Sequence, residues 1–383
     1  MKSSYRIFRI FGIDVELHLS FIFIFLIILF FISLYGSSKD SGLGSLFSGA
    51  DYGMRVVVLF ILLFGIVLMH ELAHSLVAIK NNIKVPRIVL TPIGGIANIE
   101  VPENPDIELK TSVIGPLSNY IVVIIFLPVV ILLWPEYLQL PNLYQYVFID
   151  NVFRDIFSIP EIFLIIIALN LLLGSFNLIP AFPMDGGRVL RSVMALWLDY
   201  VESTVIAVRI SQVIAIIMFF MAPFTGIIMI FISIFILIAG SNELKIVKLR
   251  HVFHSVKMGN IAIKKIRYVN EHISISDFLK LIAQVKQRHY PVVDYNKKVV
   301  GILDIEAISK INPKKLDIIS VDRVARRKFD IIDANKNVSN AISQILGKEF
   351  TLVVDSGQVV GYITPEHVFE IAQFYSISRK INM

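Results

Sequence analysis

The sequence predicts a polytopic α-helical membrane protein, with about six transmembrane helices and short membrane-surface strands, followed by a soluble α/β module built from two repeats. Of its 383 residues, 56% are hydrophobic and 17% are charged, whereas soluble domains have about 45–50% and about 25%. Residues 1–240 hold 13 Lys and Arg against 16 Asp and Glu, a net charge of −3; residues 241–383 hold 23 against 14, a net +9. Composition therefore excludes a disordered chain and makes one water-soluble globule an unsuitable description.

Six apolar stretches approach the length of about 20 residues that a spanning helix needs. They are residues 17–34, 56–78, 112–134, 162–179, 205–221 and 225–240. We expect a break at Ala222-Pro223 between the last two, because proline ends or kinks a helix. The first stretch is longer than a signal-peptide core and lacks a small-residue cleavage site, so we expect it to be retained. Residues 5–18 and 83–101 predict strands that pack on the bundle at the membrane surface.

The distribution of basic residues predicts the orientation in the cell membrane. If the N-terminus is cytoplasmic, ten Lys and Arg of the first 240 residues fall in cytoplasmic segments and three in external ones, as the positive-inside rule requires. Six crossings then place the C-terminus in the cytoplasm as well. The basic C-terminal part suits a domain beside the anionic lipid of the bilayer, and we expect no nucleic acid partner. The absence of cysteine excludes disulfides, Cys metal sites and thiol nucleophiles.

Three ionisable residues interrupt the second apolar stretch in the pattern H-E-x-x-H. His70 and His74 lie four residues apart, so a helix places both imidazoles on one face. This pair can hold one Zn²⁺, with Glu71 beside it to take a proton from a water molecule. Buried ionisable groups are costly inside a membrane and usually functional. The sequence therefore predicts a metal site here.

A catalytic zinc site takes three protein ligands and a water molecule, and Asp185 is the candidate for the third ligand. It lies within residues 177–187, a stretch in which two prolines and two glycines break the end of the fourth apolar segment. His74 lies six residues before Lys80, about 9 Å along a helix, so all three side chains can meet near the cytoplasmic leaflet. An ordinary turn remains the alternative, because Asp-Gly is a common turn pair.

These residues carry a family resemblance that extends over residues 1–240. The H-E-x-x-H string, followed by Asn177, Pro180, Pro183, Asp185 and Gly186, resembles the site-2 protease family of intramembrane metalloproteases. Residues 92–97 and 115–119 are similar to other segments of that family. The resemblance implies one Zn²⁺ held by His70, His74 and Asp185, Glu71 as the general base, and proteolysis within or near the transmembrane helices of a membrane-protein substrate. Met184 stands where the family often has Leu, and no PDZ insertion is evident, which is typical of the shorter archaeal members.

Four further residues of these segments have weaker assignments. Asn177 and Asn119 could hydrogen-bond the substrate backbone or the oxyanion, or could only join helices. Gly94 and Gly95 could let a strand approach the site or the substrate, or could form a turn.

The C-terminal part contains an internal repeat of about 60 residues. Tyr290–Asp294 and Val299–Leu303 correspond to Thr351–Asp355 and Val359–Ile363, and a helix precedes each pair. The pattern resembles a tandem pair of CBS domains. We expect a metalloprotease domain over 1–240, a charged linker over 241–254 and the CBS pair over 255–383, at about 255–312 and 318–375.

CBS pairs often bind adenine nucleotides, regulate an attached enzyme or transporter, and form homodimers. Here Thr364 matches the nucleotide signature, but Ala307 and His367 stand where the ribose-binding Asp is expected. Nucleotide binding and a purely structural or dimerising cap both remain open.

Three functions compete on these observations. The first is an intramembrane zinc protease that performs regulated proteolysis under the control of its CBS pair. The second is a CBS-regulated transporter or channel, since intramembrane acids also mark ion paths; it leaves H-E-x-x-H and the distant Asp185 unexplained. The third is a membrane metalloprotease that acts on soluble or prenylated chains.

Overall fold

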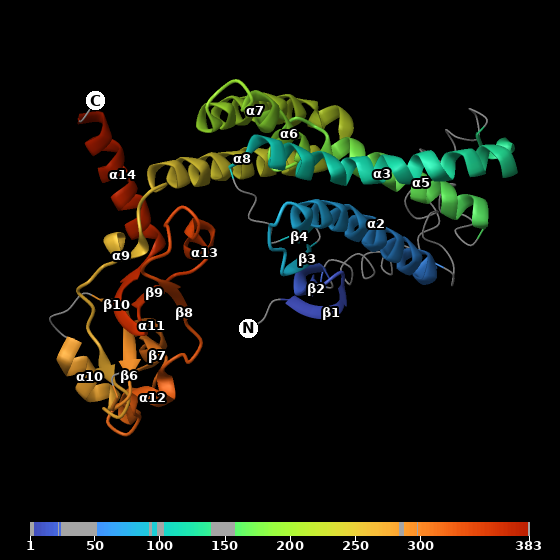
Figure 1. The fold of residues 1–383 in the computed structure, drawn as a ribbon. Coiled ribbons are helices and arrows are strands. Elements are labelled where there is room, and N and C mark those ends of the chain that lie inside the picture. The colour runs from blue at the N-terminus through green and yellow to red at the C-terminus, as the bar shows by residue number, and fades with distance from the viewer. Residues whose placement is uncertain are drawn as a thin grey trace. The chain divides into compact units, whose positions relative to one another are not determined.

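The computed structural model describes residues 4–21, 23, 52–91, 94–97, 103–138, 158–282, 287–296 and 298–381. The chain divides into two compact units, Met1–Glu243 and Leu244–Met383, which Figure 1 shows as a helical part and a part with small sheets. The domain and linker boundaries expected from the sequence stay predictions.

Five helices among the described residues are long and apolar enough to cross a membrane. They are α2 (Tyr52–Lys80), α3 (Pro105–Leu133), α5 (Ile159–Asn177), α7 (Tyr200–Thr225) and α8 (Ile228–Val252). They correspond to the second to sixth predicted spans, which confirms the helical membrane class. Of the first predicted span, residues 24–34 lie outside the described residues, and Leu17 belongs to a strand.

Three of the helix ends that differ from the predicted limits have a clear local reason. Helix α3 begins seven residues early because the Asn104 side chain accepts hydrogen bonds from the backbone N–H groups of Asp106 and Ile107 and caps the helix. Helix α7 passes Pro223 and ends before Gly226, whose φ of 115° suits glycine. Helix α8 continues through the charged residues after 240. The length of an apolar stretch predicts the part of a helix that faces lipid, and the helix itself can extend beyond it.

A four-stranded sheet lies against the C-terminal end of α2. Its order is β1 (Ser4–Ile10), β2 (Ile13–His18), β3 (Arg87–Thr91), β4 (Gly94–Ala97), with β2 and β3 parallel and the outer pairs antiparallel. Alternate residues of β2 and β3 are buried, as one-sided packing requires, and they form a core with the last turns of α2; its buried members are Ile13, Val15, Ala78, Val85, Ile88 and Leu90. The strands predicted within 5–18 and 83–101 are confirmed.

Helix α3 is central to the first unit. It contacts α2, α5 and the short helix α6 (Asp185–Met194), and α6 also contacts α7. The 3₁₀ turn η2 (Pro135–Leu138) follows α3. In Figure 1, α3 runs beside α5 along much of its length. This arrangement puts one face of α3 against the helix that carries the two histidines.

The second unit contains the predicted repeat. Its first half comprises α9 (Met258–Ile261), β5 (Val269–Asn270), α10 (Ile275–Ile282), β6 (His289–Val293), β7 (Val299–Asp304) and α11 (Ile305–Ile308). After η3 (Pro313–Lys315), the second half comprises α12 (Val321–Val324), β8 (Asp330–Asp333), α13 (Ile342–Leu346), β9 (Thr351–Asp355), β10 (Gln358–Ile363) and α14 (Pro365–Ile381). Each half forms a three-stranded sheet with one parallel and one antiparallel pair.

The two halves exchange segments. The residue Ile263, just after α9, pairs with Tyr362 of β10, and Arg326, just after α12, pairs with Ile302 of β7. Met258 of α9 is buried in the core of the second half, and Val321 of α12 in that of the first. Neither half therefore completes its core alone.

Candidate metal centre

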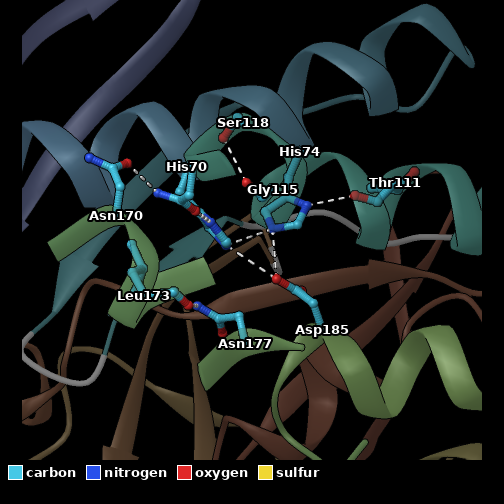
Figure 2. Close-up of polar contacts among 10 residues, drawn as sticks. His70, His74, Thr111, Gly115, Ser118, Asn170, Leu173, Asn177 and Asp185 are labelled. Atoms are coloured by element: carbon cyan, nitrogen blue, oxygen red, sulfur yellow. Dashed lines mark hydrogen bonds and ion pairs between the residues drawn. The ribbon is translucent and has the colours of Figure 1, made fainter. Parts of the chain in front are cut away.

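His70 and His74 present their Nε2 atoms to one point on the face of α2. Both side chains are buried, one helical turn apart, and their Nε2 atoms are 3.0 Å apart. The Oδ2 atom of Asp185 lies 3.1 Å from each Nε2. Figure 2 shows the three side chains pointing toward one another from α2 and from the start of α6. The structure thus brings the three predicted ligands together.

The break between α5 and α6 is what carries Asp185 back to α2. Helix α5 ends at Asn177, and Asp185 is the first residue of α6. A side chain at Gly186 would collide with the carbonyl oxygens of Leu178 and Ile179, and one at Gly187 would meet the backbone of Ala181. The two glycines therefore let the first turn of α6 sit directly on the connecting segment.

The outer ring nitrogens of the two histidines face oxygen acceptors. His74 Nδ1 lies 2.6 Å from the backbone carbonyl oxygen of Thr111, and His70 Nδ1 lies 2.6 Å from Oδ1 of Asn119. A ring nitrogen opposite a carbonyl oxygen carries the proton, so each Nε2 presents a lone pair toward Asp185.

The donor set fits a divalent cation. Two imidazole lone pairs and a carboxylate oxygen meet at 3.0–3.1 Å, and three acceptors so close repel one another unless a positive charge joins them. In a tetrahedral zinc site with Zn–N bonds of about 2.0–2.1 Å, the ligand atoms lie about 3.3 Å apart. Within the described residues, His70, His74 and Asp185 are the one group of metal-ligating side chains that converges in this way.

Glu71 lies next to the pair and does not belong to the converging group. Its half-buried carboxylate interacts electrostatically with His70, His74 and Asp185, and with the cationic Arg188 of α6. It therefore lies beside the three converging side chains without being one of them.

The four residues with weaker assignments have different surroundings. Asn177 ends α5, and its Nδ2 donates to the carbonyl of Leu173 at 3.0 Å. Gly94 and Gly95 belong to β4, the last strand of its sheet, where they pair with Thr91 and Leu90. Asn119 is fully buried behind His70 with both ends of its amide bonded, which disfavours contact with substrate. Their roles stay predictions.

Three features around the site were not predicted from the sequence. Gly115 of α3 abuts both imidazoles, and a Cβ there would collide with His74 Nε2. Asn170 of α5 bonds to Asn119. Arg191 of α6 forms ion pairs with Glu108 of α3 and Glu243 of α8. The Tyr200 hydroxyl donates to Glu108 at 2.9 Å, so these four side chains form one polar cluster between helices. The signal for this cluster was present, because Glu108 and Arg191 are charged residues beside apolar stretches.

The C-terminal module places Thr364 at the start of α14. Its Oγ1 accepts a hydrogen bond from the backbone N–H of His367 at 3.3 Å, as a helix cap does. In the first half, Asp304 holds the equivalent place and accepts a hydrogen bond from His289 Nδ1 at 2.6 Å, which lowers the pKa of that carboxyl. The two halves therefore differ in chemistry at this position.

The chain is similar to known proteins over its whole length. The model of Peptidase family M50 matches residues 58–221, and the CBS domain model matches residues 258–312. A zinc metalloprotease of Methanocaldococcus jannaschii is 31% identical over 100% of this chain and 99% of its own. Rip3 of Mycobacterium tuberculosis, which also carries a zinc metalloprotease name, is 23% identical over 83% of this chain and 81% of its own. The structural match to the solved site-2 protease from Methanocaldococcus jannaschii covers 63% of this chain and 95% of the solved chain, with 36% sequence identity and a TM-score of 0.43.

The M50 match spans all the residues of the candidate metal centre, and the full-length relative shares both the membrane part and the CBS part. The match to a peptidase family, and to relatives named zinc metalloproteases, favours the enzyme hypothesis over the transporter or channel hypothesis. The chain belongs to peptidase family M50, the site-2 proteases, and is a multi-pass membrane zinc metalloendopeptidase with a CBS module.

Proposed function

We propose that this metalloendopeptidase cleaves peptide bonds within or near the transmembrane helices of other membrane proteins. The observation that carries the proposal is the meeting of His70, His74 and Asp185 among helices long and apolar enough to cross a membrane. His74 lies six residues, about 9 Å, before the charged end of α2 at Lys80. A substrate segment must therefore come to the site inside the bilayer.

The three converging side chains would hold the zinc ion through two Nε2 atoms and one carboxylate oxygen. When bound, zinc supplies a Lewis acid that polarises the scissile carbonyl and acidifies a water molecule. Glu71, beside the ligands and not among them, takes the proton of that water and later gives it to the leaving amine. A helical substrate has its carbonyls in i→i−4 hydrogen bonds, so it must unwind locally before the carbonyl is accessible. We place both termini in the cytoplasm. The Lys80 end of α2, which is the end nearer the site, then faces the cytoplasm, and water reaches the site from that side.

The assignment of the third ligand predicts a loss of metal. Asp185→Ala removes the carboxylate that joins the two imidazoles, and we expect the purified variant to hold far less than one zinc per chain, where the native protein holds about one. Elemental analysis after dialysis measures this. Asp199→Ala is the matched control, because Asp199 caps α7 and is not among the three converging side chains. Full zinc content in Asp185→Ala would contradict the ligand assignment.

The choice between membrane and soluble substrates is tested with paired reporters. One carries a cleavable segment inside a transmembrane helix in liposomes, and the other carries the same segment in an extended soluble peptide. We expect turnover of the first to exceed that of the second at equal concentration, because the site lies among lipid-facing helices. Faster cleavage of the soluble peptide would favour a protease that acts on soluble chains.

We also propose that the CBS module regulates the protease by binding an adenine nucleotide and forms a homodimer. Thr364 at the start of α14 supports a hydroxyl contact to such a ligand, and the lost ribose-binding Asp predicts weak binding. Calorimetry of the full chain with ATP and AMP is expected to give a saturable heat that Thr364→Val reduces. No heat with either nucleotide would favour a structural cap. Light scattering in detergent tests the dimer.

A further inference from the structure

One face of α3 contacts both histidines through three residues at intervals of four. Thr111 offers its backbone carbonyl oxygen to His74, Gly115 abuts both rings, and Asn119 offers Oδ1 to His70. Residues four apart lie on one side of a helix, so this face opposes the i, i+4 histidine pair of α2. Figure 2 shows His74 directed to Thr111 on the side of its ring opposite Asp185.

The proton of His74 is fixed by a group that cannot donate. The backbone carbonyl of Thr111 has no hydrogen, so His74 Nδ1 carries the proton and Nε2 is free to bind a metal. No side-chain substitution can remove this acceptor.

The proton of His70 is fixed by a longer relay that also begins at a backbone carbonyl. Asn170 donates from Nδ2 to the carbonyl oxygen of Ile166 at 2.8 Å, so its Oδ1 must face the other way. That oxygen accepts from Nδ2 of Asn119 at 2.8 Å, which leaves Asn119 Oδ1 facing His70 Nδ1 at 2.6 Å. Each amide can be oriented in only one way in this chain of bonds, so Ile166 on α5 dictates which nitrogen of His70 is protonated.

Burial makes the relay effective. Asn119 and Asn170 are fully buried and His70 is 4% exposed, so water cannot replace a missing partner. With the relay intact, the wrong tautomer of His70 would turn an unprotonated Nδ1 toward Asn119 Oδ1, so that two acceptors meet with no hydrogen between them. Its Nε2 would at the same time be blocked by its own hydrogen.

We propose that Asn119 and Asn170 are positioning residues that set the tautomer of His70 and hold its Nε2 lone pair toward the metal position before the metal binds. The inference rests on the proposed ligand set and goes beyond it, because neither asparagine touches the ligand position. Partners of this kind on metal-bound histidines typically affect metal affinity 10- to 100-fold.

Zinc affinity, measured by competition with a chromophoric chelator on the full-length protein in detergent, tests the proposal. We expect Asn119→Leu to bind zinc about 10- to 100-fold more weakly. Asn119→Asp should recover most of the loss, because one oxygen still accepts from His70 Nδ1 and the other, when protonated in this buried position, still donates to Asn170 Oδ1. Asn170→Leu should weaken binding less, because Asn119 keeps its oxygen but is free to turn its amide. Ser118→Ala is the matched control: Ser118 is adjacent on α3 and donates only to the carbonyl of Gly115 in its own helix.

The outcomes separate this inference from the proposed function. Native affinity in both leucine variants would overturn the relay while leaving the ligand set intact. A native protein without zinc, or Asp185→Ala with full zinc, would instead overturn the ligand set. Equal losses in Asn119→Leu and Asn119→Asp would show that the residue only packs the helices. Polar residues between membrane helices contribute modestly to stability, so at least one leucine variant should fold; the circular dichroism spectrum checks this, and Asn170→Leu decides alone if Asn119→Leu does not fold.

Discussion

Glu71→Gln is expected to lower the rate of cleavage of a transmembrane reporter by about 10²- to 10⁴-fold, the range typical of general acid–base catalysis. Gln has the shape of Glu and cannot take up a proton. Glu71 is not among the three side chains that converge, so the zinc content should stay at the native level. The unaltered metal content distinguishes the loss of a base from the loss of the site. Reporter cleavage in liposomes and elemental analysis of the same preparation measure both.

The control for this prediction is Glu202→Gln, the same change at an exposed position in the first turn of α7. It should leave both the rate and the zinc content unchanged. Native turnover in Glu71→Gln would exclude Glu71 as the base. A loss of zinc in that variant would indicate that Glu71 is needed to hold the metal. Arg188, which interacts with Glu71, gives no substitute for the base because guanidinium keeps its protons.

The geometry of the histidine pair was predictable because it is local. Spacing of four along one helix fixes which face both imidazoles share, and the sequence contains both residues in one apolar stretch. The strands within 4–18, 87–91 and 94–97 were also predictable, since the alternation of apolar residues along β2 and β3 shows within a few positions. The repeat in the second unit is visible as two copies of one pattern.

The support around the pair was not predictable in the same way. Asn119 and Asn170 meet because α3 and α5 pack at a particular relative rotation, and no local pattern sets that rotation. From the sequence, Asn119 could equally face the substrate. The same holds for Arg191 and Glu108, which lie 83 positions apart. Charges beside apolar stretches indicate that partners exist, but not which ones.

Removing Arg191 is expected to have the largest effect on stability. Arg191 and Glu108 are 3% and 2% exposed and form an ion pair between α6 and α3, while Glu243 of α8 lies 2.8 Å from the other side of the guanidinium. Arg191→Met leaves Glu108 charged, buried and without its cation, which typically costs about 3–5 kcal/mol. We expect the free energy of unfolding in mild detergent to fall by that amount, measured by denaturant titration. Because Asp185 begins the same helix, retention of zinc against a chelator should weaken too.

A second variant separates the buried charge from the lost packing. In Arg191→Met with Glu108→Gln the buried carboxylate is gone, and the amide oxygen still accepts from the Tyr200 hydroxyl. The double variant should therefore be more stable than Arg191→Met alone, because replacing a buried pair as a whole is often neutral while breaking it is not. The pair of exposed Arg6 and half-buried Asp14 gives the comparison: Arg6→Met should cost no more than about 1 kcal/mol. If the double variant were no more stable than the single one, the uncompensated charge of Glu108 would not explain the loss. The lost packing of the arginine over the rings of Phe182 and Tyr200 would then explain it.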